Sequence, residues 1–289
     1  MIRISQDQKS NYILFLGKIA FANVVSDVYS TGVVHIDELK IIISIPTDLT
    51  DEEQSLVVPQ IIKGFKESAS TVNCKLTIEN ITVNPWCIIG GIASAVCTKD
   101  EIIFPVNSKA GDLLILTKPL GVQLATNAPI WMKEDSENWK KIKEHLTEQD
   151  VNEAYQKALN SMIMLNHTGA QLMHKYKAHA ATDITGFGLV GHAENLLKYQ
   201  EDELDFIITR MPVIKGVKKI AEILNRHQKL MTGKMVETSG GLFISLPEEN
   251  AQKFCDEFQT ISGSECWIVG RVVSGTRKAL IQDLEIIEV

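Results

Sequence analysis

The sequence lacks features that mark several large classes of protein. It has no uninterrupted run of about 18 apolar residues, so we expect no membrane-spanning segment. It also lacks a basic stripe: the net charge is -7, and the lysine pairs at 140–141 and 218–219 have acidic neighbours. Nucleic-acid binding depends on phosphate contacts from such a stripe, so we expect no nucleic-acid partner.

Cysteine is sparse, and its spacing excludes the usual cysteine-based sites. The five cysteines include no CxxC pair, which argues against both a disulfide framework and a zinc site. No small-residue cleavage site follows the short apolar patch at 12–16, so we expect no signal peptide. A cytoplasmic, reducing location is the plain expectation. The patterns GxxxxGK[ST] and GxGxxG are missing too, which excludes a standard P-loop and a Rossmann fingerprint.

What the sequence does contain is an irregular alternation of helical and extended patterns. Residues 17–31 predict a helix, and the β-branched run at 33–45 predicts a strand. Thr50 and Glu53 have the spacing of a capping box and open a helix that Pro59 should kink or split. Because strands and helices do not follow a strict βαβ order, we expect an α+β fold rather than a doubly wound sheet.

A turn-rich segment at 105–112 is the best candidate for a domain boundary. We expect a first domain over residues 1–108 and a second over residues 109–289. In the second, Thr147 begins an apolar-faced helical pattern that should continue to about Tyr176. The further expected elements are strands at 75–83, 86–97, 113–117, 205–210, 266–273 and 277–287 and helices at 215–226 and 248–259.

The first candidate site is a polar stripe on the helix at 17–31. Its members, Asn23, Ser26, Asp27 and Ser30, have the spacing of one helix face. The stripe contains no lysine or glutamate, the residues most common on a solvated face, and a short aspartate suits a hard cation. From the pattern alone, a lined pocket and a solvent-facing stripe both remain open.

The second candidate site is the segment TDITGFGLVGH at 182–192, where an acidic residue precedes a glycine-rich turn into a helix. Backbone N–H groups at such a turn can face an anion. A carboxylate repels phosphate unless Mg²⁺ bridges them, so Asp183 indicates a metal–nucleotide site, with an ordinary helix cap as the alternative. We expect His179 and His192 to be structural, and Glu237 with its Gly-Gly pair to form a turn or a domain contact.

A resemblance to the PurM-like superfamily rests on three segments: ATDITGFGLVGHAENL (181–196), ETSGGLFISLP (237–247) and the first-helix motif GKIAFANVVSDVYSTGV (17–33). Three further segments resemble eukaryotic selenophosphate synthetases (selenide, water dikinases) in particular: VNPWCIIGGIASAVC (83–97), GDLLILTKPLGVQLATNA (111–128) and WIVGRVV (267–273). The NPW triplet argues against another PurM-like enzyme, such as a thiamine-phosphate kinase.

The resemblance implies a protein that makes selenophosphate from ATP, selenide and water and releases AMP and phosphate. It implies a two-domain PurM-like architecture and a homodimer, or a heterodimer with a family paralogue, in which paired first domains build a β-barrel and the ATP site. Asp27 matches the family's nucleotide- and Mg²⁺-binding aspartate of the first helix, and Asp183 matches its second-domain Mg²⁺ aspartate. Mg²⁺ is therefore the implied cofactor and ATP a substrate.

The sequence departs from the family pattern at two places. Full-length members carry, ahead of the first helix, a glycine-rich loop with Cys or selenocysteine and a catalytic lysine. Residues 1–16 do not contain that loop and Lys9 does not match its lysine, so we expect a truncated N-terminal domain and assign no catalytic residue. Ile78–Ile81 replace a glycine-rich nucleotide loop, and Glu79 would set a carboxylate against phosphate. The alternative function is a catalytically inactive regulator that binds nucleotide or only forms dimers.

Overall fold

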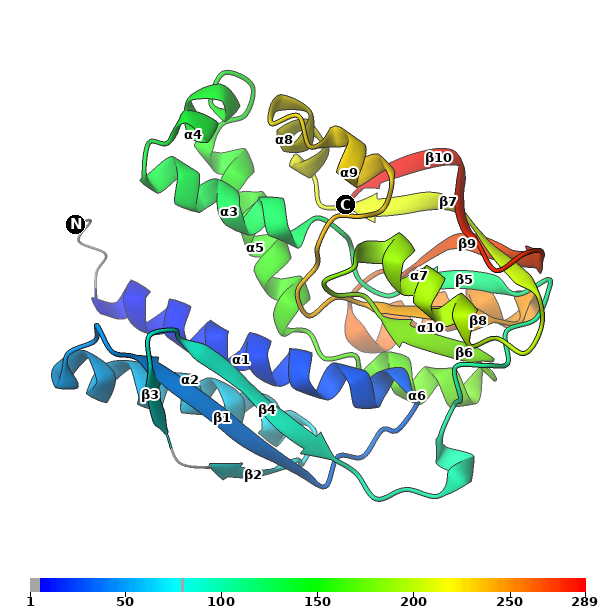
Figure 1. The fold of residues 1–289 in the computed structure, drawn as a ribbon, viewed down its shortest axis with the longest axis horizontal. Coiled ribbons are helices and arrows are strands. Elements are labelled where there is room, and N and C mark those ends of the chain that lie inside the picture. Colours follow the sequence, from blue (N-terminus) through cyan, green and yellow to red (C-terminus); the bar gives the residue numbers. More distant parts are fainter. Residues whose placement is uncertain (1–5, 79–80) are drawn as a thin grey trace.

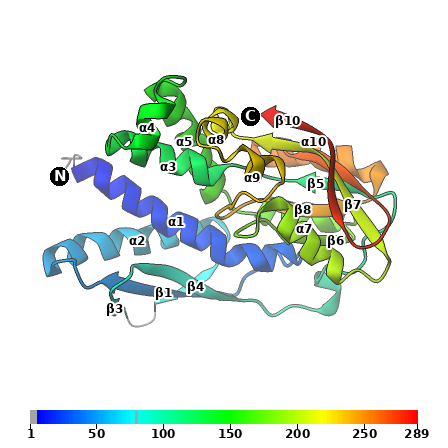
Figure 2. The ribbon, with the colours of Figure 1, turned by 45° about the horizontal axis from the view of Figure 1, so that its top comes forward.

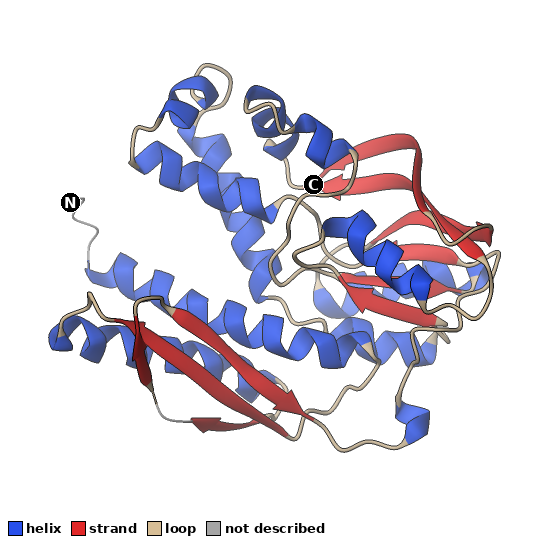
Figure 3. Cartoon of the chain, in the orientation of Figure 1, coloured by secondary structure: helices blue, strands red, loops and turns tan. Residues whose placement is uncertain are grey.

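Two β-sheets, each covered by helices, make up the computed structural model, which describes residues 6–78 and 81–289 (Figures 1 and 3). The first unit contains α1 (Gln6–Ser30), β1 (Glu38–Pro46), α2 (Asp51–Thr71), β2 (Lys75–Ile78), β3 (Thr82–Asn84), β4 (Ile88–Ser94) and the short 3-10 helix η1 (Lys99–Glu101). The second unit contains β5 (Leu113–Leu116), α3 (Val122–Lys133), α4 (Glu137–Ile142), α5 (Glu148–Ile163), α6 (His167–Lys175), β6 (Ala180–Asp183), α7 (Gly188–Lys198), β7 (Leu204–Val213), α8 (Val217–Ile223), α9 (His227–Met231), β8 (Leu242–Leu246), α10 (Glu248–Ser262), β9 (Trp267–Ser274) and β10 (Ala279–Glu288).

The first sheet is built around β1. Strands β2 and β3 pair with β1 in parallel along one edge, and β4 pairs with it antiparallel along the other. Alternate residues of β1 (Leu39, Ile41, Ile43 and Ile45) are buried in a core shared with α1 and α2. This period of two is what a strand with one covered face requires. At Gly91 a Cβ would lie 2.6 Å from the Lys40 carbonyl oxygen, so glycine permits the close approach of β4 to β1.

The second sheet has the order β10-β7-β9-β5-β8-β6 among the described strands. On β5, Leu114 and Leu116 enter a core with α3, α5, α7 and α8, whereas Ile115 enters a core with α6 and α10 on the opposite face. A mixed sheet covered by helices on both faces, next to a separate sheet with its own helical layer, is an α+β arrangement. The predicted fold class is therefore confirmed.

Several expected elements differ in extent from the observed ones. α2 has the predicted capping box at Thr50 and Glu53, but it runs without a break through Pro59, because buried residues on both sides of the proline pack into one core. The single helix expected from Thr147 to Tyr176 is instead two helices, α5 and α6, separated at residues 164–166. The helix expected from residue 17 begins at Gln6, residues 33–37 are not a strand, and the helix expected at 215–226 is divided into α8 and α9.

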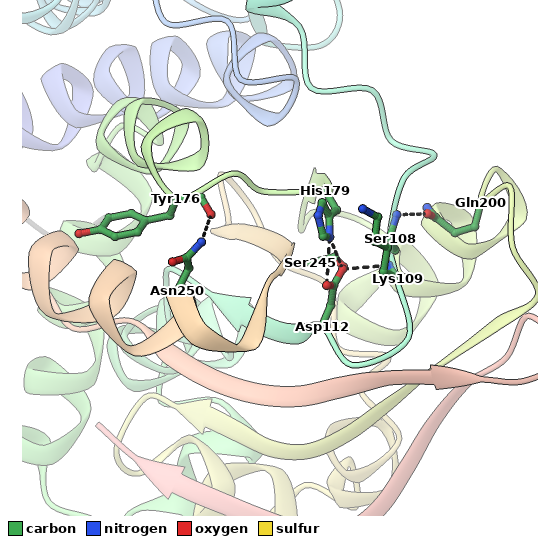
Figure 4. Close-up of polar contacts among 8 residues, drawn as sticks. All are labelled: Ser108, Lys109, Asp112, Tyr176, His179, Gln200, Ser245 and Asn250. Carbon is green, nitrogen blue, oxygen red and sulfur yellow. Dashed lines mark hydrogen bonds and ion pairs between the residues drawn. The ribbon is translucent and has the colours of Figure 1, made fainter.

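The segment that joins the two units is fixed by buried polar contacts (Figure 4). The Asp112 carboxylate accepts hydrogen bonds from His179 Nδ1 at 2.8 Å, from Ser245 Oγ at 2.6 Å and from the Lys109 backbone N–H at 2.9 Å. Gln200 accepts a bond from the Ser108 N–H at 2.8 Å. His179 is thus a structural residue, as predicted, and the joining segment is held against the second sheet.

α1 belongs to both units. Its segment Tyr12–Ser30 has a mean hydropathy of 1.3 and the length to cross a membrane, although the sequence contains no uninterrupted apolar run of that length. In the structure Phe21, Val25 and Tyr29 of this segment are fully buried in the first core, so packing accounts for these three apolar residues. The other face of α1 lies toward β6 and α6 of the second unit (Figures 1 and 2).

Candidate active site

The polar stripe of α1 lies against the second unit. Ser26 Oγ donates a hydrogen bond of 2.6 Å to Oδ2 of Asp183, the last residue of β6. One turn earlier, Asn23 Oδ1 accepts a hydrogen bond of 3.2 Å from the Ser239 backbone N–H. The stripe therefore lines a junction rather than only a solvated face. Asp27, next to Ser26, is at the exposed rim of this junction.

Asn166 ties three segments together behind Asp183. Its side-chain N–H groups donate to Ser26 Oγ and to the Gly240 carbonyl oxygen, both at 2.9 Å. Ser26, Asn166 and Asp183 are 0%, 3% and 5% exposed. Because buried polar groups are costly unless hydrogen-bonded, this chain of bonds fixes the Asp183 carboxylate relative to α1.

The two predicted metal ligands are electrostatic neighbours. Burial and the like charge of Asp183 both raise the pKa of Asp27 above its ordinary value. Two carboxylates that repel one another are stabilised when a cation lies between them, and aspartate oxygens suit a hard cation such as Mg²⁺. The described residues contain no group of three or more His, Cys, Asp or Glu side chains arranged for a metal. A Mg²⁺ ion held by one or two carboxylates completes its shell with water and substrate phosphates, which this pair fits.

Lys118 is a buried charge that sequence reasoning missed. It is 1% exposed, and its Nζ donates to the Met164 carbonyl oxygen at 2.6 Å and to the Ser239 carbonyl oxygen at 2.9 Å. Burial lowers the pKa of Lys118 to about 7, while the nearby Asp183 carboxylate opposes that change. Lys118 therefore joins two segments near Asp183. One is the break between α5 and α6, and the other is the segment before β8. The feature of the sequence that could have indicated this buried lysine is its position directly after the apolar run at 113–117.

The glycine-rich turn before α7 is shaped by His192. Its Nε2 accepts hydrogen bonds from the backbone N–H groups of Thr185 at 3.0 Å and Phe187 at 3.4 Å. Nε2 must be unprotonated to accept, and burial lowers the pKa of His192 accordingly. The Gly188 N–H is also used, because it donates to the Thr185 carbonyl oxygen. His192 is structural as predicted, and these three N–H groups do not form the anion cradle expected of the turn.

Glu237 and the glycines after it pack against other segments of the second unit. The buried Glu237 carboxyl accepts the N–H groups of Gly121 at 2.7 Å and Val122 at 3.1 Å, at the start of α3. Burial raises the pKa of Glu237 to about 8, although these two bonds oppose the change. A Cβ at Gly240 would lie 2.0 Å from the Ile184 carbonyl oxygen, so only glycine permits this approach beside Asp183.

The segment Ile78–Ile81 is only partly covered by the structure. Glu79 and Asn80 lie outside the described residues, so the prediction that Glu79 faces nucleotide phosphate stays a prediction. Ile78 and Ile81, on either side, are exposed.

Comparisons with known proteins show which family the sequence belongs to. Residues 109–283 match the family model "AIR synthase related protein, C-terminal domain". The chain is 43% identical over 281 residues to "Selenide, water dikinase 2" of Drosophila melanogaster, which covers 95% of this chain and 76% of the fly protein. The chain belongs to the selenide, water dikinase family. It is also 43% identical over 271 residues to "Selenide, water dikinase 2" of Homo sapiens, but it spans only 60% of the length of that protein.

Solved structures with lower identity agree with this assignment at the level of the fold. Thiamine monophosphate kinase of Aquifex aeolicus superposes with a TM-score of 0.68 and 18% identity, over 95% of this chain and 82% of the kinase. The hydrogenase maturation protein HypE in complex with ATP gives a TM-score of 0.67 and 14% identity, over 92% of this chain and 75% of HypE. This dikinase-family chain thus has the predicted PurM-like fold.

Proposed function

We propose that this protein forms selenophosphate from ATP, selenide and water, with release of AMP and phosphate. Membership in the selenide, water dikinase family supports the reaction class. The observation that carries the proposal is the pair Asp27 and Asp183, which come from different units and are neighbours at one junction. Formation of AMP requires that both phosphoanhydride bonds of ATP are broken, so the site must stabilise a large developing negative charge.

The residues at the junction have distinct tasks in this proposal. Asp27 and Asp183 would hold Mg²⁺, which supplies positive charge against the phosphate oxygens of ATP. Ser26 holds the Asp183 carboxylate in place through its 2.6 Å bond. Lys118 fixes the backbone of Ser239, whose N–H is bonded to Asn23 on α1. These contacts pre-organise the acidic pair before substrate arrives, which is where positioned electrostatic groups contribute most to a reaction.

The test combines binding with product formation. We expect ATP with Mg²⁺ to raise the melting temperature of the parent protein, because a ligand that binds only the folded state stabilises it. Asp27→Ala should abolish this shift. Even outer partners of metal ligands contribute about 10–100-fold, so loss of a direct ligand should lower selenophosphate formation by more than about 100-fold. Asp202→Ala, an exposed aspartate between α7 and β7, is the matched control and should behave as the parent does.

Different outcomes separate the candidate functions. Mg²⁺-dependent stabilisation by ATP without AMP or selenophosphate would favour the inactive, nucleotide-binding regulator. Absence of any shift in the parent protein at millimolar ATP would count against a nucleotide site at Asp27 and Asp183. Equal loss of activity in Asp27→Ala and Asp202→Ala would show that the effect is not specific to the proposed ligand.

We propose that the outer face of the first sheet pairs with a second copy of the chain or with a family paralogue. Ile42, Ile88 and Ile92 are exposed on this face, and β4 offers an edge that no described strand covers. Trp86, before β4, is 74% exposed and enlarges the apolar surface. Large exposed apolar patches of this kind mark interaction surfaces. Sedimentation should show a dimer for the parent protein and a smaller species for Ile92→Asp; a monomeric parent would refute the homodimer.

We also infer a cytoplasmic location. The five cysteines, two of them buried and one exposed, are all free. Free thiols on a folded surface are typical of reducing compartments. Fractionation of cells that express the protein tests this location, and recovery in a membrane or secreted fraction would refute it.

A further inference from the structure

A cavity of about 440 Å³ lies between α3 and the α8–α9 segment, and neither Asp27 nor Asp183 lines it. Its polar lining consists of Gln123, Asn225, Arg226, Gln228, Lys229 and Lys234. Three cations therefore line this cavity, and no carboxylate does. Such a lining is unusual for a chain in which 36 acidic residues outnumber 29 basic ones.

The three cations have no close acidic partner in the part of the chain that the structure describes. Among the described residues, no carboxylate forms an ion pair with Arg226, Lys229 or Lys234. Like charges gathered in one concave site raise the local potential and attract an anion. Glutamine and asparagine side chains can add hydrogen bonds to the oxygens of that anion.

The backbone around the cavity places these side chains in a defined arrangement. The Arg226 guanidinium carbon lies 5.8 Å from the centroid of the Trp131 ring, and its backbone N–H is bonded to the Ala221 carbonyl oxygen at 2.7 Å. A guanidinium packed against an aromatic ring keeps its N–H edge free for two parallel bonds to phosphate oxygens. The Lys234 N–H donates to the Lys229 carbonyl oxygen at 3.0 Å, so the backbones of these two lining residues are adjacent.

We propose that this cavity is a second anion site, which binds the phosphate groups of a small diphosphate-type ligand. Arg226, Lys229 and Lys234 together match the charge of such a ligand, and the volume exceeds the need of a single phosphate. The overall charge of -7 disfavours a nucleic-acid strand as the occupant. Gly233, next to the lining residue Lys234, contacts the first turn of α7, because its carbonyl oxygen accepts the Val190 N–H at 3.1 Å.

The second anion site differs from the acidic pair in its need for metal. Carboxylates bind phosphate only through a cation, whereas arginine and lysine bind it directly. The experiment is therefore a calorimetric titration of the full chain with pyrophosphate in the presence of EDTA. Each charge-assisted hydrogen bond contributes enough that Arg226→Gln with Lys234→Gln should weaken pyrophosphate binding at least about tenfold. Lys253→Gln, an exposed lysine on α10, makes a matched charge change and should leave the affinity unchanged.

Two further arms locate and define the ligand. Asp27→Ala should retain metal-free pyrophosphate binding; loss of binding in that variant would assign the anion to the acidic pair and overturn the second anion site. Inorganic phosphate should bind more weakly than pyrophosphate, and sulfate that binds as tightly as pyrophosphate would overturn the diphosphate assignment. Equal affinities in the Arg226/Lys234 double variant and the Lys253→Gln control, or no binding by the parent, would refute the site. Selenophosphate formation enters none of these measurements, so the two proposals fail independently.

Discussion

Replacing Ser26 with alanine removes the central member of the bond chain between α1 and the second unit. The Asp183 carboxylate loses a donor at 2.6 Å, and one Asn166 N–H loses its acceptor at 2.9 Å. All three side chains are buried, so the partners left behind are not readily hydrated. An unsatisfied buried partner costs about 1–3 kcal/mol, and two of them give an expected destabilisation of roughly 2–4 kcal/mol after some relaxation. For a chain of this size that corresponds to a fall in melting temperature of roughly 4–16 °C.

Thermal unfolding, followed by circular dichroism, measures this loss. Ser30→Ala on the same helix is the control, because Ser30 Oγ only donates to the Asp27 carbonyl oxygen one turn before it. That variant should remain within about 0.5 kcal/mol of the parent. If Ser26→Ala unfolds together with the parent and the Ser30→Ala control, the bond chain does not hold the two units together.

Two other predictions concern stability. The raised pKa of Glu237, about 8 against an ordinary 4.5, means that its contribution to stability is full below pH 4.5 and is lost as pH rises through 8. The melting temperature should therefore fall more between pH 5.5 and pH 8.5 for the parent than for Glu237→Gln. An equal fall in the two proteins would contradict this. A Cβ at Gly17 would lie 2.1 Å from the Ile61 carbonyl oxygen of α2, so Gly17→Ala should force α1 and α2 apart and destabilise the protein by roughly 1–3 kcal/mol. Gly90→Ala, which meets no atom within 4 Å, is the control, and equal stability of the two variants would disprove the close helix contact.

Local patterns were sufficient to predict most of the elements and the fold class. The capping box at Thr50 and Glu53 and the β-branched run that forms β1 depend on residues close in sequence, and both are present in the structure. The polar stripe of α1 was visible for the same reason. Its partner was not, because Ser26 and Asp183 are 157 residues apart and only the packing of the two units brings them together.

Other features could not be predicted because tertiary contacts outweigh the local pattern. The apolar face continues through residues 164–166, yet the helix breaks there, since the Met164 carbonyl oxygen binds Lys118 and Asn166 turns toward Ser26. Lysine is almost never fully buried, so no sequence rule would have placed Lys118 beside Asp183. Its burial depends on two carbonyl oxygens from separate segments, which only the folded chain supplies.

Because α1 packs in the first core and also contacts the second unit, a substitution in the first core can shift the aspartate that α1 carries. Phe21 packs edge-on against Phe65 of α2, with ring centroids 6.3 Å apart, and it lies on the same helix as Asn23 and Asp27. A smaller side chain at Phe65 would allow α1 to move closer to α2. Because α1 is a continuous helix, Asp27 would move with it. Misplacement of a reacting group by about 1 Å can cost 100-fold in rate. Variation in this remote hydrophobic contact could therefore change the proposed reaction rate without altering either aspartate of the acidic pair.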